Sequence, residues 1–212
     1  YPKINIGDVM STDQFSLSTL AASGNHKKLA DYMEESAFEN WKNDIVNALR
    51  KAVSNGHRKC LQVLVDNPHV SEWIASDDNI RYVGQALIDI FKNSDGIKPG
   101  KVSCAIFLLN KFKDKLVAIE KNVGVLEQCI KEVVQVLPEK FSRLHTRLFN
   151  LLFNDDDVVE LATRSNWLLG NVLYQAARFG QEGFVTALLG KPEVLRAIAT
   201  HSPRSFRDAS EN

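Results

Sequence analysis

The residues of this chain that could carry out chemistry are few, and one loop is the first candidate. The segment Asp95–Lys101, DGIKPGK, has the glycines and the lysine of a phosphate-binding loop. Such a loop needs four residues between its glycines, a Ser or Thr after the lysine, and a strand before it. Here three residues separate Gly96 from Gly100, Val102 follows the lysine, and no strand is expected upstream. We therefore expect a surface loop without phosphate chemistry.

Histidine, cysteine and acidic residues are scattered along the chain. Cys60 could act as a nucleophile beside a distant histidine, but its place in an apolar stripe favours burial. The acidic run Asp155–Asp157 could bind calcium, but no glycine or distal glutamate follows at the required spacing, so we expect it to cap a helix. Three cysteines without a CxxC spacing argue against a zinc site or a disulfide framework. The histidines share no metal-ligand spacing and are expected at turns or helix surfaces: His26, His57, His69, His145 and His201. We predict no catalytic residue, no cofactor and no metal.

The composition is typical of an ordinary globular protein. The 212 residues include 26 basic and 26 acidic side chains, and this balance argues against nucleic acid as the partner. The apolar runs are far shorter than the roughly 18 residues that a membrane span needs, so we expect no membrane insertion. The first residues lack a signal-peptide pattern and begin on Tyr1. We expect a cytoplasmic protein, trimmed from a longer chain.

The element that positions these residues is an internal repeat. The stretch Asn47–Ile74 returns as Asn171–Ile198, with every equivalent position 124 residues apart and no gap. Within the first copy, Leu49, Ala52 and Val53 share one helical face, and Gly56 is expected to end that helix in a turn. A second apolar stripe predicts an antiparallel partner helix; its residues are Cys60, Leu61, Leu64 and Val65. A cap residue and a proline, Asn67 and Pro68, then predict a third short helix.

The same second-helix stripe occurs three more times, shifted by 32 residues toward the N-terminus and by 44 and 88 toward the C-terminus. The fold expected is therefore all-α, a helical-repeat solenoid of about five units over residues 1–200, followed by a polar tail at 201–212. In the third unit the connection Asn93–Lys101 is expected to be a loop, because it is rich in Gly, Pro and Ser.

Two of the helix pairs resemble the ankyrin repeat. The runs Leu49–Val65 and Leu173–Leu189 are similar to its motif L-H-x-A-A-x-x-G-H-x-x-V-V-x-L-L-L. The Gly-His pair is matched by Gly56 and His57. The close resemblance covers about a third of the chain, and it implies a stack of helix pairs that binds other proteins.

The chain departs from the ankyrin pattern in the segments between helix pairs. The Thr-Pro opening is absent, and a predicted third helix stands where the family has a β-hairpin. The spacings between successive second stripes are 32, 44, 44 and 36, whereas the family keeps a steady 33. We therefore expect an ankyrin-like stack in which extra short helices replace the hairpins. Such degenerate repeats resemble those of effector proteins that intracellular bacteria deliver into host cells, which would place the protein in the host cytoplasm.

The function predicted is that of a protein-protein interaction scaffold, with another protein as partner and no small-molecule substrate. Stacks of this kind present a continuous concave face built by their first helices. Phe179 is the sharpest candidate, since an aromatic beside the turn glycine is not needed by the core; the alternative is a contact with the preceding unit. The predicted partner-binding residues are Lys51, Ser54, Asn55, Asp89, Lys92, Asn93, Gln175, Arg178 and Phe179.

Two other functions remain open from the sequence. The chain could be the targeting or substrate-recruiting module of a larger multidomain enzyme or bacterial effector, or the stack could hold an unrecognised active site.

Trp41 and Trp73 occupy equivalent third-helix positions and are expected in the core, whereas Trp167 has no equivalent.

Overall fold

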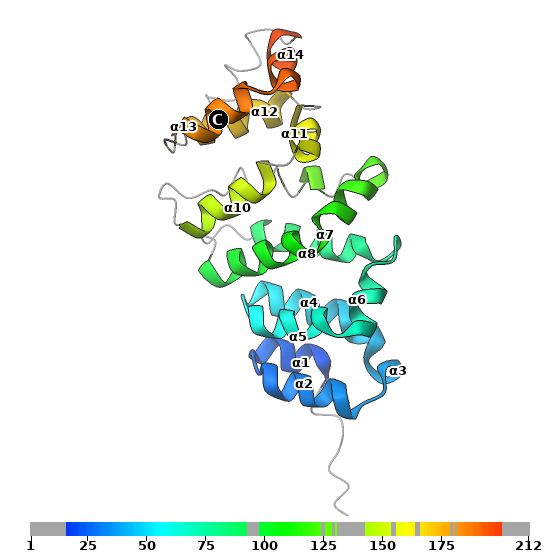
Figure 1. Ribbon diagram of the computed structural model, residues 1–212. Coiled ribbons are helices and arrows are strands. Elements are labelled where there is room, and N and C mark those ends of the chain that lie inside the picture. The colour runs from blue at the N-terminus through cyan, green and yellow to red at the C-terminus, as the bar shows by residue number, and fades with distance from the viewer. Residues whose placement is uncertain are drawn as a thin grey trace, which may run out of the picture.

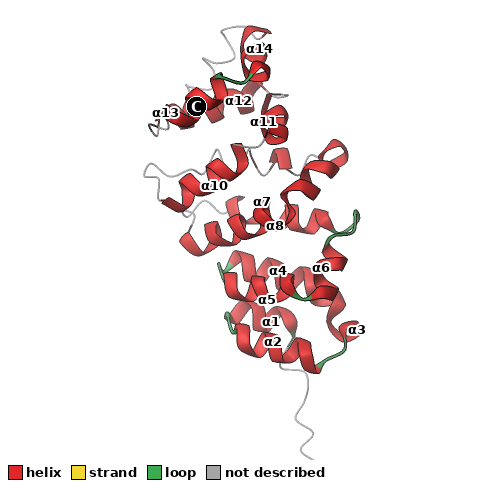
Figure 2. Ribbon diagram, in the orientation of Figure 1, coloured by secondary structure: helices red, strands yellow, loops and turns green. Residues whose placement is uncertain are grey.

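The computed structural model describes residues 16–92, 98–123, 126–128, 130, 143–153, 156–163, 166–178, 180 and 182–200. Every regular element in these ranges is a helix, and no strand occurs among them (Figure 2). The prediction of an all-α protein is confirmed. The predicted polar tail lies outside the described residues, and so do residues 93–97 of the predicted loop.

The helices follow one another in pairs, often with a third short helix after the pair (Figure 1). The first half contains α1 (Leu17–Ser23), α2 (His26–Glu35), α3 (Phe38–Trp41), the 3-10 helix η2 (Lys42–Asp44), α4 (Ile45–Ser54), α5 (Arg58–Asp66), α6 (Pro68–Ile74) and α7 (Ile80–Lys92). The second half contains α8 (Pro99–Val123), α10 (Arg143–Phe153), α11 (Asp156–Thr163), α12 (Asn166–Arg178), α13 (Glu182–Leu189) and α14 (Pro192–Thr200).

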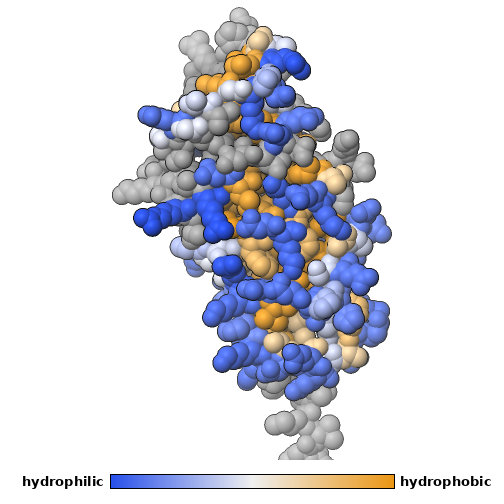
Figure 3. All heavy atoms as spheres, in the orientation of Figure 1, coloured by the Kyte–Doolittle hydropathy of each residue, from blue (hydrophilic) through white to orange (hydrophobic). Residues whose placement is uncertain are grey.

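From α1 to α10, helices pack on the corresponding helices of the next pair. Along one side α1 contacts α4, and α4 contacts α7; along the other α2 contacts α5, α5 contacts α8, and α8 contacts α10. The predicted apolar stripes form these contacts, because Leu49, Ala52 and Val53 of α4 and the whole stripe of α5 are buried. Most of these helices are too short to be stable alone in water, so burial against neighbours is what holds their shape. On the face that Figure 3 shows, polar side chains cover most of the surface over α1 to α6, with apolar areas between them.

The turn between paired helices is the same at three places. Gly24, Gly56 and Gly180 have φ angles of 76°, 72° and 63°, in the left-handed region that favours glycine. The amide of each donates to the carbonyl three residues earlier, on Ala21 at 3.4 Å, Val53 at 3.0 Å and Ala177 at 3.0 Å. The predicted helix, glycine turn and helix is confirmed at Gly56 and at its equivalent Gly180.

Turns of neighbouring pairs lie against each other. A Cβ added to Gly56 would meet the backbone of Gly100 at 2.9 Å, and one added to Gly24 would meet the ring of His57 at 2.9 Å. The Nε2 atom of His57 lies 3.1 Å from the carbonyl oxygen of Ala22, to which it donates when that nitrogen carries the proton. The prediction that His57 is a turn residue bonded to backbone is confirmed, and its partner belongs to the preceding pair.

The third helix predicted at Asn67 and Pro68 is confirmed as α6. It begins at Pro68, and the side-chain oxygen of Asn67 accepts hydrogen bonds from the amides of His69 at 3.1 Å and Val70 at 3.3 Å. Helix α11 begins at Asp156, within the acidic run that we expected at a helix start. Asp155, which precedes Asp156 in the sequence, lies outside the described residues.

Helix α8 differs from the sequence prediction at both ends. The predicted loop Asn93–Lys101 is wrong for its last three residues, because α8 begins at Pro99, where the fixed φ of proline suits a first helical position. At the other end α8 runs on to Val123, well past the predicted stripe, and Phe112 and Leu116 continue its buried face.

The added length of α8 holds the preceding pair in place. Lys111 Nζ donates to the carbonyl of Val65 at 3.1 Å and to Asp66 Oδ1 at 2.7 Å, at the end of α5. One turn later Lys115 Nζ donates to the carbonyl of Ala75 at 2.8 Å, directly after α6. Cations at helix C-terminal carbonyls satisfy unpaired acceptors and interact favourably with the helix dipole.

Substitution of the turn glycines separates backbone strain from steric contact. Gly180→Ala should lower the free energy of unfolding by about 1 to 2 kcal/mol, since φ is positive but no atom lies within 4 Å of the new Cβ. Gly56→Ala should cost about 3 kcal/mol or more, because strain adds to a backbone clash. Urea denaturation of each variant measures these differences.

Two further glycines complete this series. Gly100→Ala tests the clash alone, because its Cβ would lie 2.8 Å from the carbonyl oxygen of Gly56. Gly183→Ala in α13, with open space around the new Cβ, should be neutral or slightly stabilising. Equal losses for Gly56→Ala and Gly180→Ala would contradict the turn contact.

Lys111→Met should lower the free energy of unfolding by about 1 kcal/mol, because it keeps the aliphatic stem but removes the charged donor from the end of α5. Lys59→Met, on the exposed side of α5, is the matched control and should change stability by less than about 0.5 kcal/mol. Thermal or urea unfolding of the two variants makes the comparison. Equal effects would count against stabilisation of the end of α5 by the Lys111 ammonium group.

Candidate binding groove

A groove runs between α4 and α7, the first helices of two successive pairs. Both helices bury one face in the core and leave polar residues at the side where they meet. The cavity has a volume of about 380 Å³ and is lined by Asn47, Arg50, Lys51, Ser54, Asp89 and Lys92. The four lining residues of α4 fall at i, i+3, i+4 and i+7, the spacing of one helical face.

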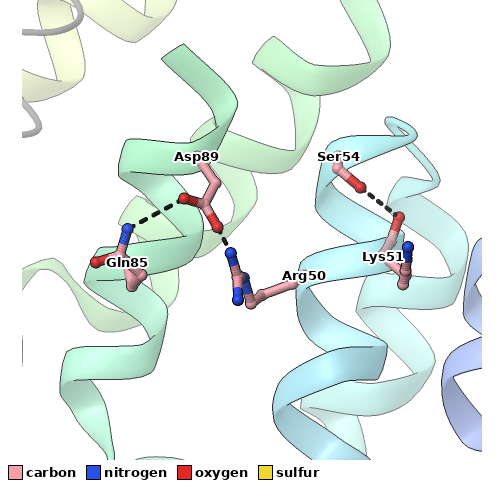
Figure 4. A network of polar contacts seen from close by, with 5 residues as sticks. All are labelled: Arg50, Lys51, Ser54, Gln85 and Asp89. Carbon is pink, nitrogen blue, oxygen red and sulfur yellow. Dashed lines mark hydrogen bonds and ion pairs between the residues drawn. The ribbon is translucent and has the colours of Figure 1, made fainter. Parts of the chain in front are cut away.

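An ion pair crosses the groove. Arg50 Nε on α4 lies 2.8 Å from Asp89 Oδ2 on α7, and Gln85 Nε2 donates to the other carboxylate oxygen at 3.1 Å (Figure 4). The Asp89 side chain is only 20% exposed, and these two contacts hold both of its oxygens. The Arg50 side chain is 53% exposed, and solvent screening keeps the contribution of such a pair to stability at about 1 kcal/mol or less.

The groove carries more positive than negative charge. Among the described lining residues, Arg50, Lys51 and Lys92 face one carboxylate, that of Asp89, in a chain whose formal net charge is zero. Lys51 and Lys92 are exposed and form no ion pair with another described residue. Within the part of the chain that the structure describes, two ammonium groups of the groove are therefore without an ionic partner.

The structure brings together four of the nine predicted partner-binding residues, namely Lys51, Ser54, Asp89 and Lys92. Asn55 lies outside the groove, where its amide donates to the carbonyl of Ala22 at 3.0 Å and joins the stacked turns. Asn93 and Phe179 fall outside the described residues, so the sharpest sequence candidate stays untested.

Two lining residues were missed by the sequence prediction. Asn47 and Arg50 line the groove but were not among the residues selected. Their signal was present, because both share the helical face of Lys51 and Ser54. The ion pair with Asp89 was not recognisable, since 39 residues separate the partners.

The equivalent face of α12 has a different chemistry. Asn171, Tyr174, Gln175 and Arg178 lie 124 residues after the four lining residues of α4. Tyr174 is 40% exposed, and Trp167, one helical turn before Asn171, is 39% exposed. The side-chain oxygen of Gln175 is buried and has no hydrogen-bond partner among the described residues. At this end of the chain the first helix offers aromatic side chains where α4 offers cations.

The other tryptophans have structural positions. Trp41 is buried, as predicted, and its Nε1 donates to the carbonyl of Ser36 at 3.2 Å. Trp73 is only half-buried and stacks on Tyr82, with ring centroids 5.8 Å apart and planes 3° from parallel. The expectation of a core position therefore holds fully for Trp41 and in part for Trp73.

The remaining chemical candidates are dispersed. No group of three potential metal ligands occurs among the described residues. Cys60 and Cys104 are fully buried free thiols, as the apolar stripe predicted. Burial raises the pKa of Cys60, and it raises the pKa of Cys104 to about 12, against a smaller opposing effect of Arg58. Both thiols are therefore protonated at neutral pH and are poor nucleophiles.

Within the described ranges, no helix is both long and apolar enough to cross a bilayer. No protein-family model, curated protein or solved structure matches the chain.

The buried thiols predict how stability depends on pH. The native state holds the Cys104 proton up to about pH 12, whereas an unfolded thiol loses it near 9.0. The stabilising contribution is therefore complete below pH 9 and is lost as pH rises between these two values. In a Cys129→Ser background, chemical denaturation from pH 8 upward should show this decline, and Cys104→Ala should reduce its slope. A thiol reagent that labels Cys60 and Cys104 as fast in native as in unfolded protein would contradict their burial.

Proposed function

We propose that the chain is a protein-interaction module, a helical-repeat solenoid of ankyrin-like pairs that binds a partner protein through the concave face of its first helices. The observation that carries this proposal is the groove between α4 and α7. Four residues chosen from the sequence as partner-binding line one cavity there.

The arrangement of the pairs supports the solenoid. First helices contact first helices, and second helices contact second helices, from α1 to α8. The same glycine turn occurs at Gly24, Gly56 and Gly180. Stacks in which each repeat contacts its neighbours form one extended surface, which suits binding of a long partner segment.

The lining of the groove favours a protein over a small-molecule ligand. Small-molecule sites are mostly apolar and enclosed, with a few convergent polar groups. This groove is open, and all of its described lining residues carry a charged or polar group. The exposed Trp167 and Tyr174 on α12 add the residue types that contribute most at protein interfaces.

Site-specific photo-cross-linking tests the proposal. A photoreactive amino acid is placed at Ser54 or at Arg178, the equivalent position 124 residues on, both on first helices. The matched control positions are Gln62 and Thr186, also 124 apart and exposed on the second helices α5 and α13. Cross-linking in lysate, read by mass spectrometry, should yield the same partner from both first-helix positions.

The control positions decide the result. They should yield little of that partner, because the second helices form the opposite side of the stack. Equal yields of one partner from all four positions would refute binding by the first-helix face. Absence of any cross-linked protein at Ser54 and Arg178 would also count against the proposal.

A further inference from the structure

We infer that the partner segment that occupies the groove between α4 and α7 is an extended acidic peptide, rich in Asp and Glu. This inference rests on the proposed function and adds the chemical class of the ligand. It is carried by the charge that the groove leaves unpaired.

The carboxylate of Asp89, the one acidic group among the described lining residues, is already neutralised. Asp89 has one oxygen on Arg50 at 2.8 Å and the other on Gln85 at 3.1 Å (Figure 4). Arg50 is used in the same contact, so the positive charges that remain are those of Lys51 and Lys92. They stand on different helices, one on each side of the cavity. A ligand that lies along the groove meets an ammonium group from both walls.

The helix dipoles reduce this charge but do not reverse it. Lys51 and Lys92 lie in the last turns of α4 and α7, where the dipole is equivalent to about half a negative charge. Each lysine carries a full positive charge, so the excess remains positive. Ser54 and Asn47 add polar side chains that can bond to a peptide backbone.

The same features argue against a nucleic acid. Phosphate backbones are bound by several cations along a stripe, and single strands need aromatic platforms for their bases. Counting the described residues alone, the groove offers two lysines without an ion-pair partner and no aromatic lining residue. Carboxylates spaced along a peptide match two separated point charges better.

The titration experiment uses the full chain and a synthetic peptide of alternating Glu and Gly, with a Gln-Gly peptide of equal length as the neutral probe. Backbone-amide NMR detects weak binding and locates it. The Glu-Gly peptide should shift amides of α4 and α7, and its affinity should fall as salt rises, because exposed charges are screened beyond about 10 Å at moderate ionic strength. The Gln-Gly peptide should bind at least about tenfold more weakly.

Matched charge reversals locate the effect. Lys51→Glu with Lys92→Glu should weaken the Glu-Gly peptide by about tenfold or more, since two attractions become repulsions. Lys27→Glu with Lys59→Glu changes the net charge equally on the exposed sides of α2 and α5, and should leave affinity within about twofold. Asp89→Asn should tighten binding severalfold, because it removes the negative charge and frees Arg50.

Three results would overturn the inference: no binding of the Glu-Gly peptide, equal losses in the two double variants, or tighter binding of single-stranded RNA at the same lysines. The proposed function can be judged separately. If Ser54 and Arg178 cross-link a partner protein while the Glu-Gly peptide fails to bind, the interaction surface stands and its acidic ligand is refuted.

Discussion

Burial of apolar helix faces against the neighbouring pair is the interaction on which the structure depends. Helices such as α4 and α5 are about ten residues long and would be marginal in water by themselves. They persist because Leu49, Ala52 and Leu61 are withdrawn from water between one pair and the next. Each of these pairs therefore depends on its neighbours for stability.

Such packing requires the turns to approach closely. Gly56 meets the backbone of Gly100, and His57 covers Gly24, so the pairs are held at a small separation. The long helix α8 adds hydrogen bonds from Lys111 and Lys115 to the ends of α5 and α6. The lysine ammonium groups thus bond to carbonyl oxygens at the ends of helices whose faces pack through apolar side chains.

A helix that buries one face leaves the other free to vary. The packing of α4 uses its apolar face and places no demand on Arg50, Lys51 or Ser54. The same positions of α12 carry Tyr174, Gln175 and Arg178. One backbone arrangement thus presents a cationic groove in one place and exposed aromatic side chains in another. A surface of this kind suits a binding function, because its chemistry can change without a change in the packed core.

The sequence by itself determined the helical class, the turn at Gly56 and the third helix at Pro68, because these follow from local periodicity, glycine conformation and proline geometry. It also selected Lys51 and Ser54 as residues that the core does not use. The tertiary structure alone decided that Asp89 pairs with Arg50 and that Asn55 joins the turns, since both contacts join residues more than 30 positions apart. Local patterns reveal which face of a helix is buried. Only packing reveals which polar residues of one helix reach those of the next.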